Sequence, residues 1–107
     1  MEKALCYTVT ATFRDQAQRD QYVAWLGSGH MQEVLRGGAL RAEIVVISDP
    51  ALPIRVEARY VFADSAGFEA YVRDHAPRLR AEGLARFGPE TGIAFSRALG
   101  DIHEIVG

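Results

Sequence analysis

The feature that most constrains this chain is a strand followed by an interrupted helix, a pattern that occurs twice. Residues 4–13 and residues 54–63 alternate apolar with polar side chains, as strands with one buried face do. A helical segment follows each of them, and we expect Asp15 to cap the first helix and Ser65 the second. Two further strands are predicted, at residues 40–48 and 93–99. The predicted order of elements is therefore β-α-β-β-α-β.

Both helical segments contain residues that interrupt a helix. Gly27 and Gly29 lie within three residues of each other, and glycine is a poor residue for a helix interior. A shorter helix is predicted to start at His30 and to end at Gly37. In the second segment, Pro77 is expected to kink the helix or to restart it.

A β-α-β-β-α-β order is typical of the ferredoxin-like fold, an α+β fold in which two helices cover one face of a four-stranded antiparallel sheet. The chain has 107 residues, which is the usual size of one domain, so we expect a single domain over residues 1–107. The apolar sides of the strands at 4–13 and 54–63 are expected to face the helices.

Composition excludes several classes of function. Twelve basic and fourteen acidic residues give a net charge of −2, which provides no positive field for nucleic acid. A single cysteine, Cys6, excludes an internal disulfide and a multi-cysteine metal site, and three scattered histidines do not support a metal site either. With no apolar run of ~18 residues and no signal-peptide pattern, we expect a cytoplasmic protein without a membrane span.

The face of the sheet away from the helices is expected to carry mostly small and polar side chains. These are Cys6, Thr8, Thr10, Thr12, Arg55, Glu57, Arg59, Ala94, Ser96 and Ala98. One alternative is a bare face in contact with water. The other is a face-to-face homodimer, because small side chains let two sheets approach closely and Arg–Glu pairs fix their register.

Arg97 stands out in the last strand. Alternation places it on the helix-covered side together with Phe95, among apolar neighbours. A buried guanidinium is costly unless it is paired or contacts an anion. Arg97 is therefore expected either to pair with a carboxylate such as Glu82 or Asp74, or to reach the edge of the sheet, or to hold an anion or enolate.

Two histidines are candidates for proton transfer. His30 opens the short helix, where the positive end of the helix dipole favours the neutral imidazole that a general base requires; the alternative is a simple capping role. His75 lies on the apolar stripe of the second helix and is either a core residue or an acid–base group. The third histidine, His103, lies in a polar tail and is expected to be solvated.

Five aromatic side chains are expected between the sheet and the helices. They are Tyr7, Trp25, Tyr60, Tyr71 and Phe95. Such residues form either a packed core or the wall of a pocket for a flat organic ligand, to which tyrosine hydroxyls offer hydrogen bonds.

Three segments of the chain together match a known pattern: WLGSGHMQEVLRGGAL, RYVFADSAGFEAYVRDHAPRLRAEGLARFG and FSRAL. With them, the chain resembles a family of small, functionally uncharacterised bacterial proteins of the dimeric α/β-barrel superfamily. The matching residues are Trp25, His30 to Leu35, Tyr60, His75 to Leu79, Phe87, Phe95 and Arg97. The Gly-Ser-Gly before His30 departs from the family pattern. The resemblance implies a homodimer and a cavity between sheet and helices in each subunit.

Members of this superfamily include cofactor-independent monooxygenases, isomerases and polyketide cyclases, and others bind haem. Our leading hypothesis is a homodimeric enzyme without a cofactor that acts on a small aromatic or enolisable compound. His30, with His75, would transfer protons, and Arg97 would stabilise an oxyanion or carboxylate. The alternatives are a non-catalytic ligand-binding or structural homodimer, and haem binding.

Overall fold

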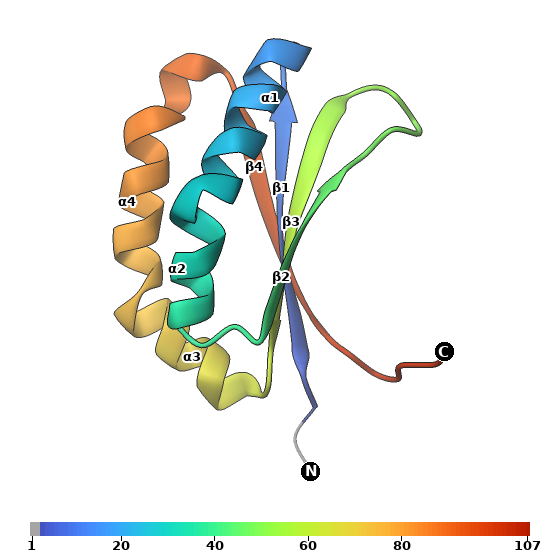
Figure 1. The fold of residues 1–107 in the computed structure, drawn as a ribbon, viewed down its shortest axis with the longest axis vertical. Coiled ribbons are helices and arrows are strands. Elements are labelled where there is room, and N and C mark those ends of the chain that lie inside the picture. Colours follow the sequence, from blue (N-terminus) through green and yellow to red (C-terminus); the bar gives the residue numbers. More distant parts are fainter. Residues whose placement is uncertain (1–2) are drawn as a thin grey trace.

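The computed structural model describes residues 3–107 and has the predicted order of elements (Figure 1). The four strands are β1 (Leu5–Phe13), β2 (Arg41–Val46), β3 (Ile54–Phe62) and β4 (Ala94–Asp101). The α-helices are α1 (Gln16–Trp25), α2 (Met31–Arg36), α3 (Ser65–Asp74) and α4 (Ala76–Arg86). A kinked turn, η1 (Leu26–His30), joins α1 to α2, and a short 3-10 helix, η2 (Pro89–Thr91), precedes β4.

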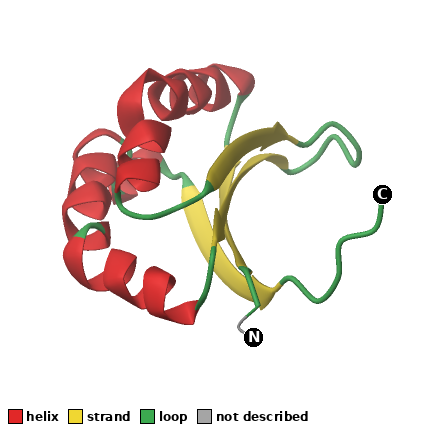
Figure 2. Cartoon of the chain, turned by 60° about the horizontal axis from the view of Figure 1, so that its bottom comes forward, coloured by secondary structure: helices red, strands yellow, loops and turns green. Residues whose placement is uncertain are grey.

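The strands form one antiparallel sheet in the order β2-β3-β1-β4, so that β1 and β3 are central and β4 is an edge strand. Figure 2 shows the helices on one side of the curved sheet, and the β2–β3 loop and the C-terminus on the other. This arrangement confirms the ferredoxin-like prediction.

The helix boundaries follow from local chemistry. Asp15 caps α1 as predicted, since its Oδ1 accepts a hydrogen bond of 2.8 Å from the backbone N–H of Gln18. The prediction that Ser65 caps the second helix is wrong. Asp64 is the cap, and its Oδ1 accepts a hydrogen bond of 2.7 Å from the backbone N–H of Gly67, while Ser65 is the first helical residue.

The predicted helix interruptions are both present. α3 ends at Asp74 and α4 restarts at Ala76, with Pro77 in the first turn, where the missing N–H leaves no hydrogen bond broken. In the other half, Ser28 and Gly29 leave helical backbone angles within η1, and α2 ends at Arg36 before Gly37. Each interruption therefore separates two short helices.

The hydrophobic core lies between the sheet and the helices. Its most completely buried side chains come from both layers: Phe62, Leu26, Leu79, Val34 and Val56. Aromatic rings from both layers meet there, as between Tyr22 and Phe87, whose centroids are 5.3 Å apart. Close packing of this kind fixes the distance between the layers and so shapes any space left between them.

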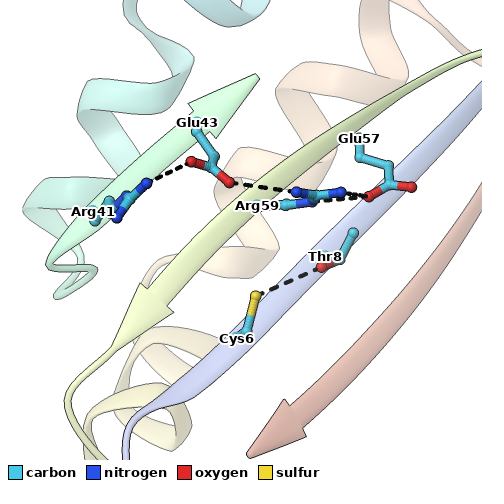
Figure 3. A network of polar contacts seen from close by, with 6 residues as sticks. All are labelled: Cys6, Thr8, Arg41, Glu43, Glu57 and Arg59. Carbon is cyan, nitrogen blue, oxygen red and sulfur yellow. Dashed lines mark hydrogen bonds and ion pairs between the residues drawn. The ribbon is translucent and has the colours of Figure 1, made fainter. Parts of the chain in front are cut away.

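The opposite face of the sheet carries the side chains expected from the alternation. The register pairs Thr8 with Arg59 and Thr10 with Glu57. Figure 3 shows a row of ion pairs across β2 and β3 on this face. Arg41 lies 2.8 Å from Glu43, Glu43 lies 3.6 Å from Arg59, and Arg59 lies 2.8 Å from Glu57. We call this row the ion-pair ladder; its charges compensate one another within the chain.

Two kinds of feature are missing from residues 3–107. No helix in this range combines the length and the apolar composition that crossing a bilayer would require. Nor do three or more His, Cys, Asp or Glu side chains in this range come close enough together to hold a metal ion.

Candidate active site

A cavity of about 220 Å³ lies between the helices and the sheet. All four tyrosines of the chain and its single tryptophan line this cavity, together with two phenylalanines. These residues are Tyr7, Tyr22, Tyr60, Tyr71, Trp25, Phe87 and Phe95. From the sequence, two alternatives were open for the aromatic residues, a packed core or the wall of a pocket. The structure has a cavity there, and each of the five predicted aromatic residues lines it.

The tyrosines supply hydrogen-bond donors to a wall that is mostly apolar. The hydroxyl of Tyr60 lies 3.3 Å from the sulfur of Met31 and donates to it. The hydroxyls of Tyr7, Tyr22 and Tyr71 have no hydrogen-bond partner within residues 3–107. Burial raises the pKa of Tyr22 and of Tyr71 to about 12, against the smaller opposing effect of the Arg97 charge, and burial also raises the pKa of Tyr60. At neutral pH these three phenols are protonated donors.

Trp25 and His30 form a stacked pair in the wall of the cavity. Their ring centroids are 4.2 Å apart and their planes differ by 26°. In an α-helix, residues five apart point in directions about 140° apart, so they could not stack. The kink changes this angle, because Ser28 and Gly29 leave helical backbone angles and Gly29 has a φ of 125°. The Ser28 hydroxyl donates a hydrogen bond of 2.6 Å to the Ala24 carbonyl within the same turn. The Gly-Ser-Gly segment is therefore what brings the imidazole onto the indole.

His30 is held in its neutral form. Burial lowers its pKa from the ordinary value of 6.5, against the weaker opposing effects of Glu82 and Glu33. Its Nδ1 is buried and has no hydrogen-bond partner among the described residues. An imidazolium needs acceptors for two N–H groups, so this site disfavours the charged form. The sequence predicted a neutral His30 from the helix dipole, and the largest cause of its lowered pKa is burial.

Arg97 lies on the predicted face but is not buried. It pairs in register with Val9 and lines the cavity with Phe95, yet its side chain is exposed because β4 is an edge strand.

The predicted alternative partners of Arg97 are occupied elsewhere. Glu82 lies 3.2 Å from Arg78, and Asp74 lies 3.0 Å from Arg73. Within residues 3–107, Arg97 has no carboxylate within 4.0 Å.

The model of a family called "Domain of unknown function (DUF4286)" matches residues 4–102, nearly the whole chain. The chain belongs to the DUF4286 family. This confirms the resemblance to an uncharacterised family. No curated protein matches the chain significantly in sequence.

Solved structures similar to this DUF4286 chain share its fold at low sequence identity. A dimeric ferredoxin-like protein from an uncultured marine organism has a TM-score of 0.73 and 19% identity, covering 98% of this chain and 100% of the other. A second protein of that description, also from an uncultured marine organism, has a TM-score of 0.74 and 9% identity, covering 96% and 97%. SnoaB, a cofactor-independent oxygenase from Streptomyces nogalater, has a TM-score of 0.67 and 12% identity, covering 97% of each chain. At these identities, the likeness establishes the fold alone.

One expected site residue of the DUF4286 chain lies outside the cavity. His75 stands at the junction of α3 and α4 and does not line the cavity. Its ring is parallel to that of Tyr71, 6.4 Å away, and lies against Gly37, where an added Cβ would be 3.0 Å from its Cγ. The break between α3 and α4 turns this histidine toward α2, so the structure does not bring it to His30 and Arg97.

Other lining residues were not selected from the sequence of the DUF4286 chain. Tyr22 lies three residues before Trp25 and therefore shares its helix face, a signal that would have found it. Arg80 projects from α4 one residue after the buried Leu79, at the border of an apolar stripe. Gly83 is one turn further along α4, and a Cβ added there would be 3.4 Å from the indole ring of Trp25. The positions of Tyr22, Arg80 and Gly83 at the cavity depend on how α1 packs against α4.

Proposed function

We propose that this DUF4286 protein is an enzyme that acts, without a cofactor, on a small aromatic or enolisable organic compound bound in the cavity. The observation that carries the proposal is the meeting of three kinds of group around one apolar space. These are a neutral imidazole, protonated phenols, and a guanidinium without a carboxylate partner. The fold that the chain shares with the oxygenase SnoaB supports it.

The chemistry begins with the removal of a proton from the substrate. Of the titratable side chains that line the described cavity, His30 is the one whose ordinary pKa lies near neutrality. A neutral imidazole has one nitrogen free to accept a proton, which makes His30 the general base. Loss of a proton from an acidic C–H or O–H leaves an enolate or phenolate.

The rest of the cavity suits that anion. The guanidinium of Arg97 and the unpartnered hydroxyls of Tyr7, Tyr22 and Tyr71 would donate hydrogen bonds to the negative oxygen. Trp25, Tyr60 and Phe95 would hold the flat ring. The anion then takes back a proton at another atom in an isomerase, attacks a carbonyl carbon in a cyclase, or reacts with dioxygen in a monooxygenase. One proton abstraction thus serves all three reaction types.

The test follows exchange of substrate protons for deuterium. Phenylpyruvate and acetophenone are enolisable one-ring compounds whose exchange in deuterium oxide is followed by NMR. We expect the protein to accelerate exchange, His30→Gln to abolish the acceleration, and Arg97→Gln to reduce it. His103→Gln is the matched control, since its ring lies in the tail, 3.1 Å from Lys3 and away from the cavity. Exchange no faster than in buffer for both compounds would overturn the proposal.

A binding role without catalysis is the second candidate. It is favoured by the Nδ1 of His30, which has no carboxylate or carbonyl to orient the ring or to stabilise the imidazolium. Saturable binding of both compounds without any acceleration of exchange would establish this candidate in place of the first.

We also propose that two copies of the chain pair through the open face of the sheet, which is the face away from the helices. Thr8, Thr10 and Ala98 are small, and the ion-pair ladder leaves no unpaired charge to desolvate on that part of the face. Two structures of the same fold are described as dimeric, which supports the pairing.

Charge reversal tests the dimer. Arg59→Glu would place a third carboxylate between Glu43 and Glu57, so repulsion should raise the dimer dissociation constant at least about tenfold in sedimentation velocity experiments. Arg73→Glu makes the same change of charge on α3, away from the sheet, and should leave assembly unchanged. A monomeric wild-type protein at micromolar concentration would contradict the proposal.

A further inference from the structure

The charges that border the cavity are all of one sign. Arg80 from α4 and Arg97 from β4 line it, and the described lining contains no aspartate or glutamate. This contrasts with the chain as a whole, whose net charge is −2. Like Arg97, Arg80 has no carboxylate within 4.0 Å among residues 3–107. The cavity is therefore a positive region in a slightly negative protein.

The two guanidiniums come from opposite layers and act on the same phenol. The charges of Arg80 and of Arg97 both lower the pKa of Tyr71 against the larger effect of its burial, so both lie within electrostatic range of its ring. The Tyr71 hydroxyl has no hydrogen-bond partner in the described chain. Both arginine side chains are exposed, whereas Tyr71 is only 5% exposed. A protonated hydroxyl thus lies inside, with two cations at the solvent side.

The volume limits what can lie behind these groups. An apolar cavity of ~150 Å³ engineered in another protein takes up benzene, and sites for drug-sized ligands measure roughly 300–1,000 Å³. At about 220 Å³, this cavity has room for one aromatic ring with a short substituent. The ring would lie against Tyr22, Trp25 and Phe95, and the substituent would point to the solvent side.

We infer that Tyr71, Arg80 and Arg97 form an anion-binding subsite, and that the ligand is a one-ring aromatic compound carrying a carboxylate. A planar guanidinium matches a carboxylate in shape and charge, and the phenol adds a third donor. The inference rests on the proposed function in one respect only, namely that the cavity takes up a small aromatic molecule. It requires no reaction.

Calorimetric titration with benzoate and with benzamide tests the charge requirement, because the two probes have the same ring and nearly the same shape. Fluorescence of Trp25 locates the binding, since this is the only tryptophan of the chain and it lines the cavity. We expect benzoate to bind more tightly than benzamide. Arg80→Gln, Arg97→Gln and Tyr71→Phe should each weaken benzoate binding about fivefold or more and leave benzamide binding unchanged.

Two controls accompany these variants. Arg73→Gln removes one positive charge from an exposed site on α3 and should not alter either affinity. Anthracene-carboxylate carries the same anion on three fused rings and should bind at least about tenfold more weakly than benzoate, because the cavity is too small for it. Tighter binding of the three-ring acid would overturn the size limit.

Equal affinities for benzoate and benzamide, no binding of benzoate, or an Arg97→Gln effect no larger than that of Arg73→Gln would overturn the subsite. The outcomes are separate from those for the proposed function. Selective benzoate binding without catalysed exchange would support the subsite and contradict the proposed enzymatic function. Catalysed exchange with no preference for the anionic probe would support the enzymatic function and contradict the subsite.

Discussion

Two pairs of arginines on opposite sides of the sheet differ in their partners. On the open face, Arg41 and Arg59 lie in the ion-pair ladder, where each contacts a carboxylate (Figure 3). On the helix-covered face, Arg80 and Arg97 border an aromatic cavity and have no carboxylate within 4.0 Å in the described chain. In the ladder each charge is already compensated, whereas the charges of Arg80 and Arg97 beside an apolar space are the ones that we propose to bind an anion.

The faces should differ most in their contribution to stability. Phe62→Ala removes a fully buried ring from the helix-covered face and should lower the free energy of unfolding by about 3–5 kcal/mol. Thr10→Ala, on the open face, should lower it by about 1 kcal/mol or less. Denaturant titration of both variants measures the difference. Similar losses would mean that the open face packs as a second core.

The second-largest effect is expected at alkaline pH, where the buried hydroxyl of Tyr22 on the helix-covered side changes the free energy of unfolding. The pKa of Tyr22 is about 12 in the folded chain and 10.0 ordinarily, so the unfolded chain releases this proton first as the pH rises. The contribution to stability is present below pH 10.0 and is lost as the pH rises through about 12. Tyr22→Phe should therefore lose less stability than wild type between about pH 8 and about pH 11, as measured by urea unfolding. An identical loss would show that the hydroxyl is solvated.

A smaller effect of the opposite sign is expected from His30 at acid pH. Its pKa is lower in the folded chain than the ordinary value of 6.5, so the unfolded chain binds the proton first as the pH falls. The contribution of His30 to stability is retained above pH 6.5 and decreases as the pH falls from 6.5 toward the folded-state pKa. His30→Gln should flatten this part of the pH dependence, and NMR titration of the imidazole measures the pKa directly. A pKa above 6.5 would contradict the neutral base.

The smallest effect is expected in the ion-pair ladder. Arg59→Gln removes two ion pairs from a side chain that is 38% exposed, and exposed pairs of this kind contribute about 0–1 kcal/mol. The subunit should therefore unfold almost as wild type does. A loss of more than ~2 kcal/mol without a change in oligomeric state would show that the ladder is structural and not merely compensating.

The fold could be predicted because its signals are local. Alternation within residues 4–13 and 54–63 gave strands that the structure places at Leu5–Phe13 and Ile54–Phe62. Glycine and proline marked both helix breaks. The error at Ser65 is also local, because Asp64 precedes it and either residue type can cap a helix.

The site could be predicted only in part, because it depends on which elements become neighbours. Alternation gave the face of Arg97, but its exposure follows from the position of β4 at the sheet edge, which no short segment encodes. His75 does not line the cavity, because the break between α3 and α4 places it against Gly37. Arg80 could not be predicted as a lining residue, because its place at the cavity depends on how α4 packs against the sheet.

Gly83 links the volume of the cavity to the stability of α4. In the interior of α4 a glycine destabilises the helix by roughly 0.5–1 kcal/mol relative to alanine, and a Cβ would fit there at ordinary contact distance from Trp25. One added methyl group would therefore stabilise the helix and at the same time reduce the volume of the cavity. A substitution at position 83 that raises stability is thus expected to lower the size limit of the proposed ligand.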